Sequence, residues 1–428
     1  MKHFAVVGNP ISHSRSPELY NSAFADIGFD GYYSRILAHE VEDVKLLLNS
    51  QNLAGINVTA PMKRKMNAIC DSFSPEAKAI GAVNYLSNGG NPDGDLVGYN
   101  TDCIGVEEVI AKHGLNTRKV LILGAGNAAR AAVYALQQTG CEIVVAARPG
   151  NSSKKLQEDF KVRLIDIKNY YAELRNVSLL ISALPREVFT GEPAKEFDGA
   201  DLTIFDANYS NSYFQKVAEH CNLPFICGLE WLGAQARPCF RYMTGSDKFN
   251  PSLPPVHNRN LAFIGFSGCG KSTIATEIAN MSGCHCADLD SMISNQFGMP
   301  LTRVFERFGE EEFRKVETNF LRRLMNENRL VIACGAGILD VEENREILSK
   351  DAFRVRLYAP LETCLERVAL TEPRPKLRNP AEAEQLFKRR NSLYFENSDL
   401  NFVTERKTVH ECAAFILQDL QYFENNNA

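Results

Sequence analysis

The feature that most constrains the fold of this chain is a glycine-rich turn at 265–273, Gly-Phe-Ser-Gly-Cys-Gly-Lys-Ser-Thr, directly after the apolar run 261–264. A strand that enters such a turn and leaves it as a helix points several backbone N–H groups at one spot, where the helix dipole adds positive charge. A polyphosphate fits that spot. A glycine-rich surface turn would not explain why Lys and Ser follow the last glycine. The residues predicted to bind the nucleotide are Gly268, Cys269, Gly270, Lys271, Ser272 and Thr273.

Two residues of this turn have distinct expected roles. Lys271 would reach the outer phosphates as a point charge, and the hydroxyl of Ser272 would bind the Mg²⁺ that bridges them. The turn thus predicts ATP-type chemistry with magnesium.

Length and composition bound the rest of the chain. A chain of 428 residues predicts two or three domains, and 45% hydrophobic with 23% charged residues is typical of a soluble protein. A net charge of −5 argues against nucleic acid as the main partner. Twelve scattered cysteines predict reduced thiols in the cytoplasm rather than disulfides or zinc sites. Neither a membrane helix nor a secretory signal is expected, because no apolar run is long enough.

Polar residues follow the apolar run 4–7 near the start of the chain. The loop 11–17, Ile-Ser-His-Ser-Arg-Ser-Pro, offers hydroxyls beside the free N–H groups of a helix expected from Pro17. This arrangement suits an anion or a polyol, although a solvated helix cap would use the same residues.

Further polar residues end the next predicted strands. Asn57 and Thr59 share one face of a strand by period-2 alternation, and Lys63 begins a helix whose dipole disfavours its charge unless an anion lies near. Asn84 and Asp102 end two more strands. Each could be a cap, and Asp102 in particular suits the N-cap of a helix at 104–112. Their clustering within one small α/β unit favours a site.

A dinucleotide-binding unit follows. The strand 119–123, a G-x-G-x-x-A turn, a helix to about 138 and a strand at 142–146 predict that Gly124, Ala125, Gly126, Asn127 and Ala128 approach a dinucleotide. After the second strand, where an acidic residue would hold the ribose of NAD, the chain has Arg148. An Arg suits a 2′-phosphate, so NADP is preferred. If Arg148 instead belonged to a solvated basic loop, the choice between NAD and NADP would stay undecided.

A Pro-rich linker is predicted at 246–259.

Beyond the phosphate loop, residues 285–290 are predicted to form a short strand with Asp288 and Asp290 on one face. One carboxylate would bind Mg²⁺ and the other would contact an acceptor hydroxyl. Residues 305–317 read as a turn and a helix start. The Pro- and Arg-rich stretch 367–378 reads as a mobile basic flap.

The part from 1 to about 245 resembles shikimate dehydrogenase in the motifs at 8–17, 57–63, 81–84, 100–102, 124–130 and 228–235. The resemblance implies NADPH-dependent reduction of 3-dehydroshikimate to shikimate, with Lys63 and Asp102 as the catalytic pair. It also implies that Ser14 and Ser16 bind the substrate carboxylate. The remaining expected substrate ligands are Asn57, Thr59, Asn84, Tyr209 and Gln235.

The part from about 260 to 428 resembles shikimate kinase in the phosphate loop and in the motifs at 288–290, 305–317, 335–337, 374–375 and 390–394. The resemblance implies ATP-dependent phosphorylation of shikimate. Asp290 would contact the acceptor hydroxyl, Arg314 and Arg390 the shikimate carboxylate, and Arg374 the ATP. Gly335 and Gly337 would let the backbone approach shikimate, and Asp288 would join Ser272 at the metal.

Three departures from these families stand out. Ala336 replaces the middle of three glycines, so an extra methyl lies where backbone should meet shikimate. Tyr85 stands where Thr is usual, and Trp231 takes a place often held by Met near the nicotinamide. None of them removes a catalytic group.

The two resemblances predict an α/β protein: a dehydrogenase substrate domain at 1–101 completed by about 228–245, a Rossmann domain at 102–227, the linker, and a P-loop kinase domain at 260–428 with a parallel sheet and a lid at about 367–380. The product of the first reaction is the substrate of the second, which implies a bifunctional enzyme of aromatic amino acid biosynthesis, as a monomer or homodimer. A ligand-sensing regulator with inactive sites, or a dehydrogenase acting on quinate or with NAD, are the alternatives.

Overall fold

The structure is a computed structural model that describes residues 1–91, 94–185, 188–189, 195–209, 212–252, 260–369, 377 and 379–427, with side chains up to 421. It divides into two compact units. The first comprises Met1–Met62, Gly90–Pro92 and Asn250–Ala428, and the second comprises Lys63–Gly89 and Asp93–Phe249. The sequence-based boundaries at 101 and 246–259 stay predictions, and residues 253–259 of the expected linker lie outside the described ranges.

Strands from both ends of the chain form one parallel sheet in the first unit. Within this unit the strand order is β14 (His285–Asp288), β15 (Leu330–Ala333), β13 (Asn260–Ile264), β16 (Ala352–Tyr358), β17 (Leu400–Val403), β2 (Gly31–Leu37), β1 (Lys2–Gly8) and β3 (Leu53–Val58). The junction is the pairing of Asn401 with Ile36 and of Phe402 with Leu37. The P-loop part and the first strands of the chain thus share one backbone hydrogen-bond ladder.

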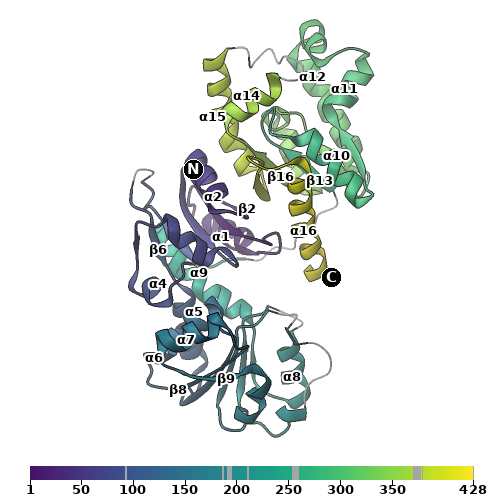
Figure 1. The fold of residues 1–428 in the computed structure, drawn as a ribbon. Helices are drawn as coiled ribbons and strands as arrows, with labels where there is room; N and C mark the ends of the chain where they lie inside the picture. The colour runs from purple at the N-terminus through teal and green to yellow at the C-terminus, as the bar shows by residue number, and fades with distance from the viewer. Residues whose placement is uncertain are drawn as a thin grey trace. The chain divides into compact units, whose positions relative to one another are not determined.

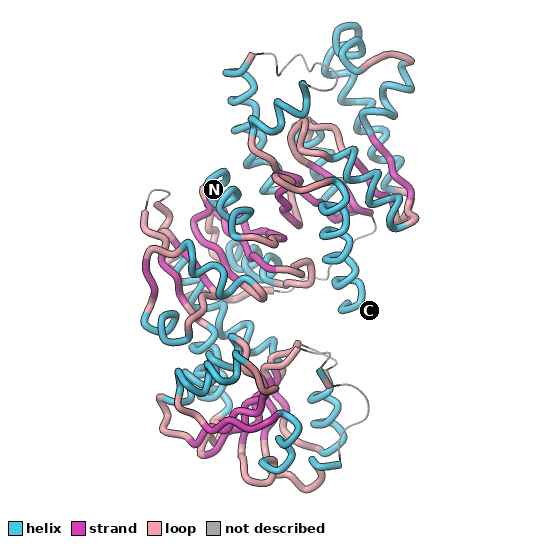
Figure 2. The backbone as a smooth tube through the Cα atoms, in the orientation of Figure 1, coloured by secondary structure: helices cyan, strands magenta, loops and turns pink. Residues whose placement is uncertain are grey.

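The α-helices of the first unit are drawn as cyan coils in Figure 2. They are α1 (Ser16–Asp26), α2 (Val41–Gln51), α10 (Lys271–Ser282), α11 (Leu289–Phe297), α12 (Leu301–Met325), α13 (Glu342–Asp351), α14 (Leu361–Ala369), α15 (Pro380–Glu396) and α16 (Val409–Asn427). The stretch 305–317 contains the expected helix start. The range of α12 joins two helices across Gly309, whose φ of 79° and ψ of 169° are not helical.

The second unit is built on a parallel sheet in the order β12 (Phe225–Ile226), β11 (Thr203–Asp206), β10 (Leu179–Ser182), β7 (Lys119–Leu123), β8 (Glu142–Ala147) and β9 (Arg163–Asp166). The chain order reverses between β7 and β10. Such a switch point is where open α/β sheets bind dinucleotides. The predicted Rossmann arrangement is therefore present.

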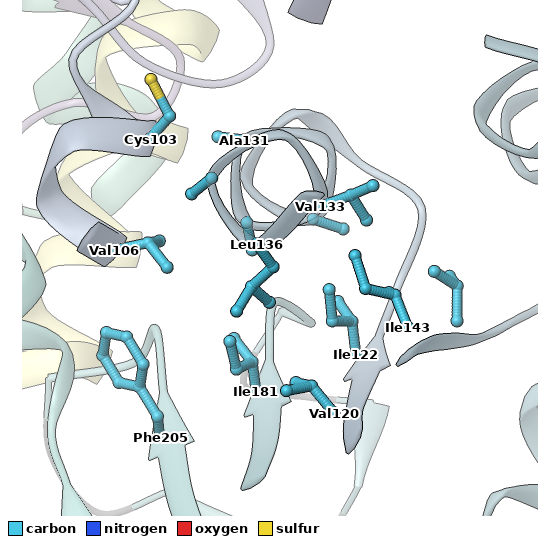
Figure 3. Packing of buried hydrophobic residues seen from close by; sticks show 14 of the residues in the cluster. Cys103, Val106, Val120, Ile122, Ala131, Val133, Leu136, Ile143, Ile181 and Phe205 are labelled. Carbon is cyan, nitrogen blue, oxygen red and sulfur yellow. The ribbon is translucent and has the colours of Figure 1, made fainter. Parts of the chain in front are cut away.

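Alternation along β7 supplies both faces of that sheet. Val120 and Ile122 pack against α6 (Asn127–Gln137) on one face, in the core shown in Figure 3. Leu121 and Leu123 pack on the other face with residues of α8 (Tyr213–Cys221). The remaining elements are α3 (Met62–Lys65), β4 (Ser72–Phe73), α4 (Pro75–Ile80), β5 (Tyr85–Ser87), β6 (Val97–Tyr99), α5 (Asp102–His113), α7 (Asn151–Phe160) and α9 (Gly228–Thr244), several of which Figure 1 labels.

Candidate active sites

The phosphate loop lies between β13 and α10, as its sequence predicts. Gly265 and Gly268 have φ of 141° and 84°, and a Cβ on either would lie 2.4 and 2.3 Å from the carbonyl oxygens of Leu357 and Cys364. Side chains at these two positions would push the loop off its neighbours. The loop borders a cavity of about 660 Å³, which the residues from Ser267 to Ile274 line together with both expected carboxylates, Asp288 and Asp290.

Lys271 is nearly buried at the start of α10. Its ammonium donates to the carbonyl oxygens of Gly265 at 2.8 Å and Phe266 at 3.0 Å. Both partners are neutral, so the positive charge of Lys271 remains available to an anion in the cavity. Ser272 is exposed beside it.

Asp288 and Asp290 both line this cavity, but not by the predicted route. The strand β14 ends at Asp288, whose side chain accepts from the N–H of Ser291 at 2.8 Å and caps α11. Asp290 lies in the first turn of that helix. The expectation of two carboxylates on one strand face was wrong, because the strand ends at Asp288 and Asp290 already belongs to the helix that follows.

A second cavity of about 170 Å³ adjoins the first and shares Ser267, Asp290 and Ala336 with it. The predicted residues Arg314, Gly335, Gly337 and Arg390 also line it, so the structure brings the expected acceptor-site residues together. A molecule in this cavity and one on the phosphate loop would both contact Asp290.

Two guanidinium groups converge on the second cavity. Arg314 pairs with Glu317 at 2.5 Å, and Arg390 pairs with Asp340 at 2.5 Å. Glu317 is fully buried, and burial raises its pKa against the opposing charge of Arg314. The buried Nε of Arg390 and Oε1 of Glu317 have no hydrogen-bond partner among the described residues. A ligand that carries both a carboxylate and a hydroxyl would satisfy both atoms.

The glycines of this cavity are required by close approach. A Cβ at Gly337 would lie 1.9 Å from Nη2 of Arg314 and 2.8 Å from Nη2 of Arg390, and one at Gly335 would lie 2.4 Å from Oε1 of Glu317. Between them, Ala336 accepts a hydrogen bond from the hydroxyl of Tyr394 through its carbonyl oxygen. This hydrogen bond holds the backbone at Ala336 in place, and Ala336 lines both cavities.

The expected lid at about 367–380 falls largely on residues 370–376 and 378, and these, including Arg374, lie outside the described residues. Arg367 is described. It donates to Thr404 Oγ1 at 3.1 Å and lines the larger cavity.

The second unit holds a separate polar cluster. The ammonium of Lys63, on α3, donates to Oδ2 of Asp102. Asn84 donates to Oδ1 of Asp102 at 2.9 Å and to Thr101 Oγ1 at 2.9 Å. Gln235 joins through Oε1, which lies 3.3 Å from Nδ2 of Asn84. Four predicted site residues thus form one network, in which Asp102 is anchored by an amide and keeps an ammonium beside it.

The side chain of Trp231, on α9, steadies this network. Trp231 is 5% exposed, and its indole N–H donates to the carbonyl oxygen of Asp102 at 2.9 Å. Gly105 permits this packing, since a Cβ there would lie 2.7 Å from the Trp231 ring. Asp102 is the first residue of α5 and not its N-cap, a position that Thr101 holds.

Two tyrosines named in the sequence analysis have different surroundings. Tyr85 is buried and stacks on Tyr242. Tyr209 is 39% exposed at the end of β11.

The dinucleotide turn has the predicted form. Gly124 has φ 109°, and a Cβ there would lie 3.1 Å from the carbonyl oxygen of Ala183 on the neighbouring strand end. Gly126 is the N-cap of α6, so Asn127 and Ala128 open that helix. Arg148 follows β8 directly and is exposed. A helix N-terminus after a glycine turn and an exposed Arg after the second strand are the features expected where a phosphorylated dinucleotide binds.

The serine loop, defined here as residues 9–16, lies in the first unit together with Asn57 and Thr59. Gly8 allows close contact with Thr59, since a Cβ at Gly8 would lie 2.4 Å from its methyl. Ser14 and Ser16 lie side by side, with their hydroxyl oxygens 3.3 Å apart. Tyr33 orients Asn57 by donating to its Oδ1 at 2.8 Å.

Several residues of these sites have no role in the sequence interpretation. Glu317 and Asp340 hold the two arginines, and Tyr33 holds Asn57. The i, i+3 spacing of Arg314 and Glu317 was a readable signal for one of them. The partners of Arg390 and Asn57 are distant from them in the sequence, so no local pattern predicted these contacts.

Within the described ranges, no helix is long and apolar enough to cross a membrane. The twelve cysteines all lie in these ranges and are free thiols.

Comparisons with known proteins match both parts of the chain. Three family models fit, namely the shikimate dehydrogenase substrate binding domain at 6–86, shikimate / quinate 5-dehydrogenase at 107–194 and shikimate kinase at 267–421. The predicted resemblances are thereby confirmed, in the predicted order along the chain.

Individual relatives match the first part. Shikimate dehydrogenase (NADP(+)) of Carboxydothermus hydrogenoformans is 31% identical over 256 residues, which cover 56% of this chain and 90% of that protein. The bifunctional 3-dehydroquinate dehydratase/shikimate dehydrogenase of Arabidopsis thaliana is 30% identical over 266 residues. The match covers 57% of this chain but only 44% of the length of that protein. A crystal structure of shikimate 5-dehydrogenase from Thermus thermophilus with NADP(H) and shikimate matches with a TM-score of 0.52 and 30% identity, over 59% of this chain and 96% of that one.

Proposed function

Because this chain belongs to the shikimate dehydrogenase family and continues into a shikimate kinase domain, we propose that it is a bifunctional enzyme that reduces 3-dehydroshikimate to shikimate with NADPH and then phosphorylates shikimate with ATP. The observation that carries the proposal is that both candidate sites keep their reacting groups. Lys63 is paired with Asp102 in one, and Asp290 lies between a phosphate loop and two arginines in the other.

In the reduction, bound NADPH supplies the hydride to the ketone. Negative charge then develops on the ketone oxygen, and the ammonium of Lys63 stabilises it and donates the proton. Asp102 pairs with the ammonium of Lys63, and Asn84 holds Asp102 in one orientation by donating to its Oδ1. We assign Ser14 and Ser16 to the substrate carboxylate, and Asn57, Thr59, Asn84, Tyr209 and Gln235 to the remaining substrate contacts.

In the phosphorylation, we assign the shikimate carboxylate to Arg314 and Arg390. The buried Nε of Arg390, which has no hydrogen-bond partner among the described residues, supports an anion there. Asp290 orients the acceptor hydroxyl or takes its proton. Lys271 neutralises charge on the phosphates, together with Arg374 as a prediction from the sequence. Mg²⁺, when bound, would supply further positive charge on the phosphates. Ser272 and Asp288 would hold it, a small ligand set that suits a metal retaining waters and phosphate oxygens.

NADP(H) is the proposed dinucleotide because Arg148 follows β8 where an acidic residue would select NAD. The Thermus relative, solved with NADP(H) and shikimate, supports both the cofactor and the substrate. Free thiols on all twelve cysteines support a reducing compartment such as the cytoplasm. The state of monomer or homodimer stays a prediction.

A coupled assay tests the proposal. Purified protein given 3-dehydroshikimate, NADPH, ATP and Mg²⁺ is expected to consume NADPH and to form shikimate 3-phosphate, with ADP appearing only after shikimate. Consumption of neither coenzyme would favour a ligand-sensing regulator and reject the proposal. Faster turnover with quinate or with NADH would favour the second alternative.

Gly337→Ala is expected to raise the KM for shikimate in phosphorylation by about tenfold or more. The added Cβ would displace the guanidinium groups of Arg314 and Arg390, and loss of one charge-assisted hydrogen bond costs roughly 1.5–3 kcal/mol. Steady-state kinetics with varied shikimate measure it. The KM for ATP and the rate of NADPH oxidation should stay unchanged, and an unaltered KM for shikimate would remove these arginines from the binding site.

A further inference from the structure

A buried carboxylate from the kinase part reaches the serine loop of the dehydrogenase part. Asp419, on α16, is 1% exposed, and its Oδ1 accepts from the backbone N–H groups of Ile11 at 2.5 Å and Ser12 at 3.2 Å. The hydroxyl of Ser12 donates to its Oδ2. Burial raises the pKa of Asp419, while these donors oppose the rise. Three donors on one buried carboxylate make a specific and costly contact rather than an incidental one.

The contact passes directly to the residues assigned to the substrate carboxylate. Ile11, held by Asp419 through its N–H, accepts from the N–H of Ser14 at 2.9 Å through its carbonyl oxygen. From the other side, Arg35 donates to the carbonyl oxygen of Ser14 at 2.6 Å through Nη2. Ser14 is therefore fixed between two charged groups, one of them from the kinase part.

The helix that carries Asp419 is itself held against the dehydrogenase strands. Phe415, one turn before Asp419, stacks on His39 with ring centroids 3.6 Å apart. Lys407, just before α16, pairs with Asp43 at 2.6 Å, and both side chains are largely buried. The strand pairing of β17 with β2 continues this contact. All of these contacts join residues of the first compact unit, to which the serine loop also belongs.

We propose that Asp419 is a positioning residue for the dehydrogenase reaction: the kinase domain supplies the carboxylate that holds the serine loop in the shape that binds the carboxylate of 3-dehydroshikimate. The inference rests on the proposed dehydrogenase function and extends it. A loop that must be ordered by the substrate would bind it more weakly, because the ordering free energy is subtracted from the binding free energy. The chemical groups Lys63 and Asp102 are not altered by this loss.

The test is steady-state kinetics of the full-length protein with Asp419→Ala. The KM for 3-dehydroshikimate is expected to rise about tenfold, while kcat and the KM for NADPH stay within about twofold of the wild type. A merely structural role would lower kcat through a smaller active fraction and leave the KM unchanged. Asp419→Asn keeps an acceptor for the two N–H groups and should restore much of the affinity. Gln418→Ala, an exposed neighbour on α16, is the matched control and should behave as wild type.

Kinase kinetics of the same proteins report on folding, because α16 also borders the nucleotide cavity through Val409 and Cys412. If Asp419→Ala loses both activities, Asp419→Asn decides the question: it supports the proposal by an intermediate KM and overturns it by a wild-type KM with lowered kcat. A wild-type KM in a well-folded Asp419→Ala protein would also overturn it. The proposed function fails separately, if the unaltered protein does not oxidise NADPH with 3-dehydroshikimate.

Discussion

Replacing Lys63 by alanine is expected to lower kcat for NADPH-dependent reduction by about a thousandfold, within the range of roughly 10²–10⁴ that a positioned acid or base contributes. The ammonium is the group in its cluster that can both stabilise the alkoxide and donate a proton, and Asp102 beside it cannot replace it. The KM for NADPH should change little, because Lys63 pairs with Asp102 and not with a residue of the dinucleotide turn. Initial rates at saturating 3-dehydroshikimate measure the effect.

The matched control is Lys65→Ala, on the same short helix but exposed. It removes one positive charge from the same surface and should leave kcat near wild type. Phosphorylation of shikimate by Lys63→Ala should also be normal, since Lys63 belongs to the other compact unit from the phosphate loop. If Lys63→Ala kept more than about a tenth of the wild-type rate, another group would have to be the proton donor.

The parts of these sites that could be predicted from sequence are those whose geometry is local. The phosphate loop and the G-x-G-x-x-A turn fix backbone direction within a few residues, and both have the expected form, with Gly265 and Gly124 at positive φ. The order of strands around β7 also follows from the βαβ pattern. Asp288 shows the limit of this reasoning: its alternation with Asp290 suggested a strand, while the helix dipole and a free N–H at Ser291 favour a cap.

The parts that could not be predicted depend on residues distant in the chain. Asp340 reaches Arg390 across 50 positions, and Asp419 reaches Ser12 across 407. No periodicity or local motif marks either carboxylate as a partner, because an Asp on a helix is read as solvated. No sequence pattern predicts the pairing of β17 with β2 either. Each strand taken alone is an ordinary buried strand, and only the register of Asn401 with Ile36 joins them.

This junction bears on how the two activities can be separated. Asn401 donates to Ser34 Oγ at 2.9 Å and to the carbonyl oxygen of Arg35 at 3.0 Å, and it accepts from the buried Arg356 at 3.0 Å. Breaking this network would leave buried polar groups unpaired in both parts at once. Point variants of reacting groups are therefore cleaner probes of each activity than removal of either part.

Lys271→Ala is expected to reverse the pattern of Lys63→Ala: phosphorylation should fall by about two to three orders of magnitude, the range for losing a charged group that stabilises a transition state, while reduction stays normal. The carbonyl oxygens of Gly265 and Phe266 that hold the ammonium are neutral and provide no substitute charge. ATP-dependent formation of shikimate 3-phosphate measures the loss.

Lys271→Arg tests whether charge alone is sufficient. The guanidinium keeps the charge, but it is larger and planar, and Lys271 is 9% exposed in a loop that leaves no room at Gly265 or Gly268. We therefore expect Lys271→Arg to remain well below wild type, whereas Lys315→Ala, which removes a lysine that is 60% exposed on α12, should be normal. Loss of NADPH oxidation in a folded Lys271→Ala protein would contradict two independent sites, because Lys271 belongs to one compact unit and the pair of Lys63 and Asp102 belongs to the other.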